Sequence, residues 1–123
     1  MSKKILLIDD EELIIRSLLK LLEKNGYEVF IAKNGEDAVV MTEEEDFDLI
    51  LADIRMPGIN GVEAVDHIYK NTKGNQKKIP AIFMTGYADE IVEKKAKTLA
   101  PVAYIYKPFD KDALLDKIKK TIG

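Results

Sequence analysis

The sequence contains no cysteine, so neither a disulfide framework nor a metal site built on thiolates is possible. Its one histidine, His67, falls inside a predicted helix and far from any strand end, which leaves a zinc-type site without support. No apolar run approaches membrane-spanning length, and residues 1–4 lead into the first strand without a signal-peptide core. The formal charge of -3 argues against a nucleic-acid binder. We therefore expect a cytoplasmic domain with no direct nucleic-acid or membrane partner.

The sequence does contain a regular alternation of strand and helix patterns. Short apolar runs predict five strands, and a helical pattern follows each of them: the runs cover residues 5–8, 27–32, 49–52, 81–84 and 103–106. Alternation of this kind predicts an α/β fold, in which helices cover both faces of a parallel sheet. With 123 residues, we expect one domain over residues 1–123 and no output domain after Gly123.

Each of four apolar runs ends on polar groups. The run at 49–52 is uninterrupted, as in a strand buried on both faces, and it ends on Asp53 before a Pro-Gly break. The other three runs end on Asp9 and Asp10, on Thr85, and on Lys107. Neighbouring parallel strands lie about 4.8 Å apart and share one carboxyl edge, where ligands bind in open α/β sheets. We therefore expect these five side chains to gather at one edge.

The gathered groups suit phosphoryl chemistry that depends on magnesium. Asp9, Asp10 and Asp53 cannot all ionise cheaply without a cation, and Mg²⁺ prefers such oxygen ligands. Lys107 adds a positive charge and Thr85 a hydroxyl donor for the oxygens of a phosphoryl group. Asp53 is the expected nucleophile because it lies on the central strand, whereas the adjacent Asp9 and Asp10 resemble paired metal ligands.

These residues carry a resemblance that covers the chain from end to end. The pattern resembles the receiver domain of two-component response regulators, through Asp9-Asp10, Asp53 followed by Met56-Pro57-Gly58, Thr85-Gly86, and Lys107-Pro108-Phe109. The resemblance implies a flavodoxin-like, doubly wound, five-stranded parallel sheet with strand order 2-1-3-4-5. It also implies a cis peptide bond between Lys107 and Pro108.

The resemblance further assigns a role to each matching position. Asp53 corresponds to the phosphoacceptor, and Lys107 to the lysine beside it. Mg²⁺ is implied as the cofactor, held by Asp9, Asp10, Asp53 and the backbone carbonyl of Arg55. Thr85 and Tyr104 correspond to the switch hydroxyl and the switch aromatic residue.

The function implied is phosphorelay signalling, not enzymatic turnover. A histidine kinase or a phosphotransfer protein donates the phosphoryl group to Asp53, which changes a surface formed by the fourth helix, fifth strand and fifth helix. A downstream effector binds that surface, and the protein is a monomer or a phosphorylation-dependent dimer. The domain assists only its own phosphorylation and dephosphorylation.

Other interpretations remain open at this point. A phosphatase of the haloacid dehalogenase type also uses a strand-end Asp, but it needs an acid two residues later, where this chain has Arg55. A flavodoxin-like FMN carrier shares the fold, but the Asp-Asp-Glu-Glu loop at residues 9–12 would repel the FMN phosphate. Taken singly, Thr85 could be an N-cap, Lys107 a surface charge and Tyr104 a packed strand aromatic.

The resemblance implies that two further positions border the path of the hydrolytic water. These positions, two after Asp53 and two after Thr85, hold the bulky Arg55 and Tyr87. We therefore expect slow self-dephosphorylation.

Overall fold

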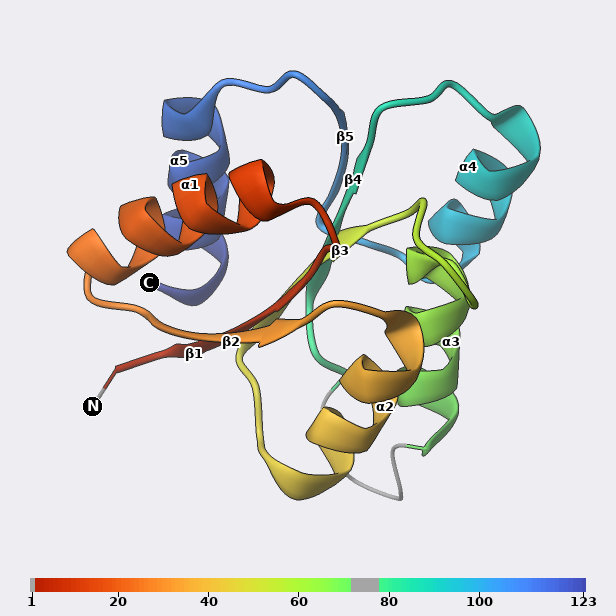
Figure 1. Ribbon diagram of the computed structural model, residues 1–123, viewed down its shortest axis with the longest axis horizontal. Coiled ribbons are helices and arrows are strands. Elements are labelled where there is room, and N and C mark those ends of the chain that lie inside the picture. Colours follow the sequence, from red (N-terminus) through yellow and green to blue (C-terminus); the bar gives the residue numbers. More distant parts are fainter. Residues whose placement is uncertain (1, 72–77) are drawn as a thin grey trace.

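The computed structural model describes residues 2–71 and 78–123, in which strands and helices alternate (Figure 1). The strands are β1 (Lys4–Ile8), β2 (Glu28–Ala32), β3 (Leu49–Asp53), β4 (Ala81–Thr85) and β5 (Ala103–Tyr106). The helices are α1 (Glu12–Lys24), α2 (Gly35–Glu44), α3 (Gly61–Asn71), α4 (Glu90–Thr98) and α5 (Lys111–Ile122). The alternation predicted from the sequence is confirmed.

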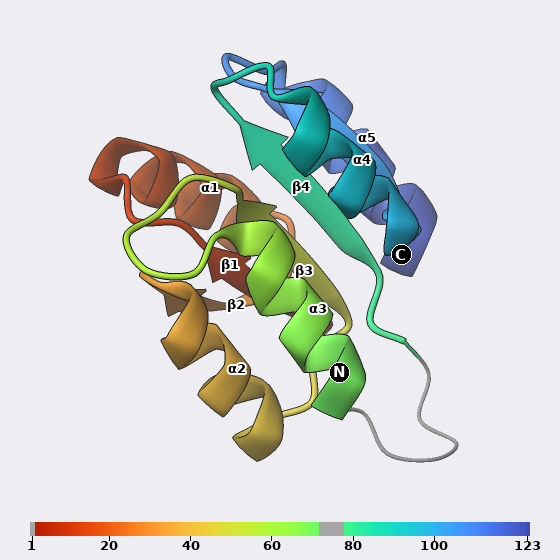
Figure 2. The same ribbon diagram turned by 90° about the vertical axis from the view of Figure 1, so that its right-hand side faces the viewer.

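The strands form one parallel sheet in the order β2-β1-β3-β4-β5. This is the order that the family resemblance implied. Every residue of β3 and β4 is buried, as expected of central strands covered on both faces. The helices α2, α3 and α4 lie on one face of the sheet and α1 and α5 on the other (Figure 2).

The two layers of helices enclose two separate apolar cores. Successive side chains of a strand point to opposite faces, so the central strands contribute to both cores. On β3, Ile50 packs in the core beneath α2, α3 and α4, whereas Leu49 and Leu51 pack in the core beneath α1 and α5. Burial of the two cores holds the helices against both faces of the sheet.

Side-chain caps set where three of the helices begin. The Asn34 side chain accepts a hydrogen bond from the Asp37 amide at 2.7 Å, which caps α2. Asn60 and Glu63 exchange side-chain to backbone hydrogen bonds at 2.8 and 2.9 Å, which form a capping box at the start of α3. Asp89 caps α4 in the same manner. These caps fix the ends of the loops that surround the site.

Two further features shape the carboxyl edge. The Lys107–Pro108 peptide bond is cis, as the resemblance implied. Gly61 packs so close to β3 that a Cβ atom there would lie 2.1 Å from the Asp53 carbonyl oxygen. Within the residues described, no helix has the length and apolar content needed to cross a bilayer.

Candidate functional site

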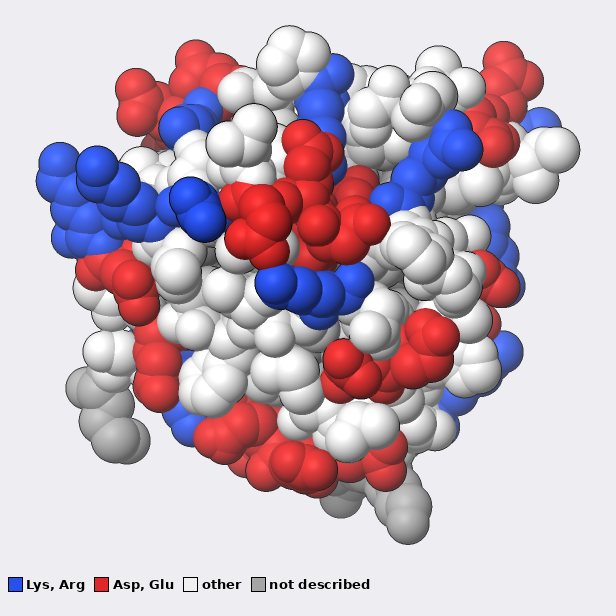
Figure 3. Space-filling view, viewed as in Figure 1, with Lys and Arg blue, Asp and Glu red and all other residues white. Residues whose placement is uncertain are grey.

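Three carboxylates meet where β1 and β3 end. Ile8 pairs with Ala52 across the two strands, so the next residues, Asp9 and Asp53, lie side by side. One oxygen atom from each of Asp9, Asp10 and Asp53 lies within 4.8 Å of the others. Asp9 and Asp53 are buried and Asp10 is exposed. In Figure 3 acidic side chains gather where β1 leads into α1, so the cluster opens to solvent on one side.

Lys107 inserts its ammonium group between these acids. Its Nζ lies 3.3 Å from Asp53 Oδ1 and 3.4 Å from Asp9 Oδ2, and its side chain is only 14% exposed. The Lys107 amide donates to the Thr85 carbonyl at 2.7 Å, which aligns the end of β5 with the end of β4. Burial lowers the pKa of Lys107, but the charges of Asp9 and Asp53 outweigh it and the pKa lies above its usual value. Lys107 therefore stays charged.

One ammonium group does not neutralise the acids. Burial, followed by the charge of Asp9, raises the pKa of Asp53 to about 6 in spite of Lys107. Burial also raises the pKa of Asp9, against a hydrogen bond from the Glu11 amide and the charge of Lys107. Carboxylates crowded in this way hold a proton or a cation. Their hard oxygen atoms, at this spacing and with access to water through Asp10, fit Mg²⁺ with several retained waters.

The Thr85 hydroxyl is engaged within its own loop. Thr85 is 2% exposed, and its Oγ1 accepts a hydrogen bond from the Tyr87 amide at 3.1 Å and donates to the Tyr87 carbonyl at 3.2 Å. Thr85 ends β4, the strand next to β3, which ends on Asp53. The hydroxyl group of Thr85, however, forms its hydrogen bonds with Tyr87 of the same loop. Of the expected groups, the structure brings Asp9, Asp10, Asp53 and Lys107 together.

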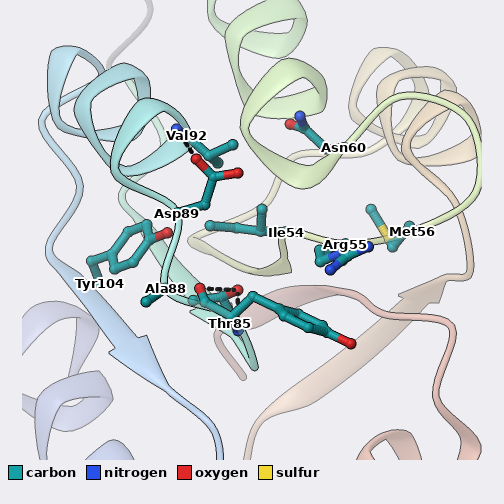
Figure 4. A pocket seen from close by; sticks show the side chains of 10 residues that line it. Ile54, Arg55, Met56, Asn60, Thr85, Ala88, Asp89, Val92 and Tyr104 are labelled. Carbon is teal, nitrogen blue, oxygen red and sulfur yellow. Dashed lines mark hydrogen bonds between the residues drawn. The ribbon is translucent and has the colours of Figure 1, made fainter.

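A pocket of about 430 Å³ lies between the β3–α3 and β4–α4 loops. Thr85 lies at its base, with Arg55 and Tyr104 on opposite sides (Figure 4). Tyr104 packs against Phe83 and Tyr106, with ring centroids 6.4 and 5.6 Å apart. Tyr104 is therefore both a packed strand aromatic and a wall of an open space.

Arg55 and Tyr87, the two bulky residues singled out in the sequence, contact each other. The guanidinium carbon of Arg55 lies 3.9 Å from the centroid of the Tyr87 ring, a cation–π contact. Tyr87 is 58% exposed, so the pair forms an outer layer over the β3 and β4 ends. The sequence placed the two residues at equivalent positions after their strands but did not predict that they stack.

Glu11 is a site residue that the sequence did not single out. Its negative charge suits the start of α1, but this accounts only for its place in the chain. Glu11 Oε1 lies 3.6 Å from Lys107 Nζ, and the Glu11 amide donates to Asp9 Oδ1 at 3.0 Å. No sequence signal marked this contact. The structure places Glu11 at the N-cap of α1, where glutamate is not among the preferred residues.

Comparison with known proteins supports one interpretation of this site. Residues 5–119 match the sequence model of a family described as the response regulator receiver domain. Sporulation initiation phosphotransferase F of Bacillus subtilis is 36% identical over 98% of this chain and 94% of its own length. Transcriptional regulatory protein CrdR of Helicobacter pylori is 38% identical over 98% of this chain, which spans 55% of CrdR.

A solved structure agrees with these sequence matches. Response regulator protein TrrA from Thermotoga maritima, in complex with Mg²⁺-BeF, is 35% identical to this chain with a TM-score of 0.81, and covers 97% of this chain and 98% of TrrA. The phosphatase and flavin-carrier alternatives gain no support from these matches.

Proposed function

The chain belongs to the response regulator receiver domain family, whose members act in phosphorelay signalling, and from this we propose that Asp53 is its phosphoacceptor. The observation that carries the proposal is the position of the Asp53 carboxylate, buried beside Asp9 and 3.3 Å from Lys107 Nζ. We also propose that residues 1–123 form one receiver domain.

The proposed reaction transfers a phosphoryl group from a phosphohistidine. A carboxylate oxygen of Asp53 forms a bond to phosphorus as the bond between phosphorus and the imidazole nitrogen breaks, and the electron pair leaves on the imidazole. Lys107 stabilises the charge on the transferred oxygens because its ammonium group already lies beside Asp53. The donor is a histidine kinase or a phosphotransfer protein. The domain assists this transfer and the later hydrolysis, in which the phosphoryl group passes from Asp53 to water and leaves as inorganic phosphate, without being an enzyme.

Mg²⁺ is the cofactor that these residues fit. Asp9, Asp10 and Asp53 would hold it, together with the backbone carbonyl of Arg55. When bound, Mg²⁺ neutralises charge on the phosphoryl oxygens. The donor set supports the assignment, because three carboxylates and one ammonium leave an excess of negative charge at a partly buried site.

Thr85 and Tyr104 are the proposed switch. The Thr85 hydroxyl exchanges its two bonds to Tyr87 for a bond to the phosphoryl group, which moves the β4–α4 loop. The space beside Thr85 lets the Tyr104 ring turn inward, because Tyr104 already lines that pocket. The two arrangements are populations in equilibrium, and phosphorylation shifts the balance between them.

The effector surface is the face formed by α4, β5 and α5. It exposes large apolar side chains that a protein partner can cover: Ile91 is 83% exposed, Tyr106 45% and Val102 44%. Tyr106 also donates a hydrogen bond to Glu93, and this bond links β5 to α4. We propose that a downstream protein, or a second phosphorylated copy, binds here in the cytoplasm.

Phosphotransfer profiling tests the assignment of Asp53. Purified histidine kinases from the same genome are labelled with radioactive phosphate and mixed with the wild-type chain or with Asp53→Asn. We expect rapid Mg²⁺-dependent transfer from one kinase to wild type and none to Asp53→Asn. Asp46→Asn, which removes an exposed acid in the loop before β3, is the matched control and should accept phosphate normally. Labelling of Asp53→Asn at the wild-type rate would refute the assignment.

A further inference from the structure

Glu11 occupies a helix start without acting as a cap. It is the N-cap residue of α1, yet its side chain makes no capping hydrogen bond. N-cap side chains normally satisfy the free amides of the first turn, and replacing a good cap costs about 1 kcal/mol. The Glu11 side chain turns instead toward Lys107, with Oε1 3.6 Å from Nζ. Its position is therefore better explained by the site than by the helix.

The backbone holds Glu11 in that position. Its amide donates to Asp9 Oδ1 at 3.0 Å, while Asp9 Oδ2 lies 3.4 Å from Lys107 Nζ. Asp9, Glu11 and Lys107 thus form a closed set of contacts. The Glu11 side chain is 56% exposed, whereas those of Asp9 and Asp53 are 0% and 7% exposed. Of the three acids that contact Lys107, Glu11 is therefore the one exposed to solvent.

We propose that Glu11 is a positioning and selectivity residue for phosphoryl transfer. It restrains Lys107 in the resting site and repels free anionic phosphoryl donors. It thereby favours a donor histidine presented by a protein that carries a basic side chain facing Glu11. The inference rests on the proposed function of Asp53. It goes further in stating that the partner protein carries positive charge where it faces Glu11.

Electrostatics sets the size of the effect. A carboxylate about 6 Å from an arriving dianion, in a water-like dielectric, slows its entry by about three- to tenfold once salt screening is included. The penalty falls with the charge of the donor and with rising ionic strength. Loss of a purely structural contact would slow all donors alike and would not respond to salt in this way.

The test compares Glu11→Gln with Glu12→Gln. Both substitutions remove one negative charge, so they change the net charge equally. Glu12 is the next acid in the chain, but it pairs with Lys33 at 2.6 Å and not with Lys107, so only Glu11→Gln removes a charge beside Lys107. Two small donors are used at saturating Mg²⁺: acetyl phosphate, a dianion at neutral pH from which acetate leaves, and phosphoramidate, a monoanion from which ammonia leaves. Phosphorylation of Asp53 is followed by mass spectrometry.

We expect Glu11→Gln to accelerate phosphorylation by acetyl phosphate about three- to tenfold and that by phosphoramidate less, with the gain reduced at about 0.5 M salt. Glu12→Gln should match wild type, and Glu11→Asp, which keeps the charge, should retain most of the discrimination between donors. In metal-free protein, the Lys107 Cε–Hε resonance should shift in Glu11→Gln but not in Glu12→Gln.

Equal acceleration by both donors, or none, in Glu11→Gln would overturn the inference while leaving the phosphoacceptor role of Asp53 intact. Failure of wild type to accept phosphate from any donor would instead refute the proposed function. The resonance shift of Lys107 requires no phosphoryl transfer, so an unchanged signal in Glu11→Gln counts against the contact itself.

Discussion

The carboxyl group of Asp53 is held in an unfavourable charged state by its surroundings. Burial and the neighbouring Asp9 raise its pKa to about 6 from an ordinary value of 3.8, with Lys107 opposing. The proposed phosphoacceptor role requires a carboxylate, and keeping Asp53 charged in these surroundings lowers the stability of the fold. The loss in the free energy of unfolding can be measured by removing the charge of Asp53.

We predict that Asp53→Asn stabilises the metal-free protein at neutral and higher pH. Between pH 3.8 and about 6 the native state binds more protons than the unfolded state, so the free energy of unfolding falls as the pH rises through this window. Asparagine removes this loss, and we expect a gain of about 1–3 kcal/mol at pH 8 that shrinks toward zero below about pH 4. Urea unfolding with EDTA present measures it. Asp116→Asn, at an acid 62% exposed on α5, should show no comparable gain.

Tyr87 and Arg55 stack on each other in the loops that follow β4 and β3. Because the pair lies 3.9 Å apart, two residues after Thr85 and Asp53, we predict that it restricts the approach of the hydrolytic water to the proposed phosphoryl site. Tyr87→Ala should speed the decay of phosphorylated Asp53 about three- to tenfold, a barrier change of roughly 1 kcal/mol. Loss of label after removal of the donor measures the decay. Tyr87→Phe keeps the ring and should decay as wild type; an unchanged rate in Tyr87→Ala would exclude this role.

At the scale of elements, the start of α3 is the tightest contact beside the site. The Gly61 amide donates to the Ile54 carbonyl at 2.9 Å, and the helix begins directly against the last residue of β3. Only a residue without a side chain lets the helix approach so closely. The position of α3 and the geometry of the Asp53 backbone are therefore coupled.

We predict that Gly61→Ala destabilises the protein by about 2–4 kcal/mol, because its Cβ would lie 2.1 Å from the Asp53 carbonyl oxygen and the backbone must shift. Gly86→Ala is the matched control. Nothing lies within 4 Å of a Cβ at Gly86, so its effect should stay within about 0.5 kcal/mol. Chemical denaturation measures both, and equal effects of the two substitutions would contradict the packing argument.

At the scale of the whole molecule, one sheet divides the interior into two cores, and the site lies at the sheet edge common to both. Strands β4 and β5 connect the site to the face formed by α4, β5 and α5, because Thr85 pairs with Tyr106 across them. A change at the Thr85 hydroxyl can therefore reach α4 through the loop and β5 through the strand pair.

We predict that beryllofluoride with Mg²⁺ shifts the amide resonances of this connected region. The largest changes should fall on Thr85, Tyr104 and the first turn of α4. Amides of α2 should stay in place, because α2 packs on α3, β2 and β1, at the opposite end of the strand order from β5. Asp53→Asn under the same conditions should show none of the shifts near Tyr104. Changes confined to the acids would show that the site and the effector surface are uncoupled.

The sequence by itself determined the parallel sheet, the ends of its strands and the caps of α2 and α3, because each depends on a local pattern. Each of these features depends on residues only a few positions apart. An apolar run with a polar residue at its end indicates a strand, and an Asn three residues before an acid indicates a helix start. Parallel pairing then sends all strand ends to one edge. The meeting of Asp9, Asp10, Asp53 and Lys107 therefore follows from the sequence and the parallel pairing of the strands.

Only the tertiary structure decided how side chains meet across those loops. The Lys107 ammonium group also faces Glu11, a contact that no local pattern encodes. The stacking of Arg55 on Tyr87 likewise depends on loop geometry and rotamers. These choices follow from packing and charge among residues distant in sequence, which a local pattern cannot record.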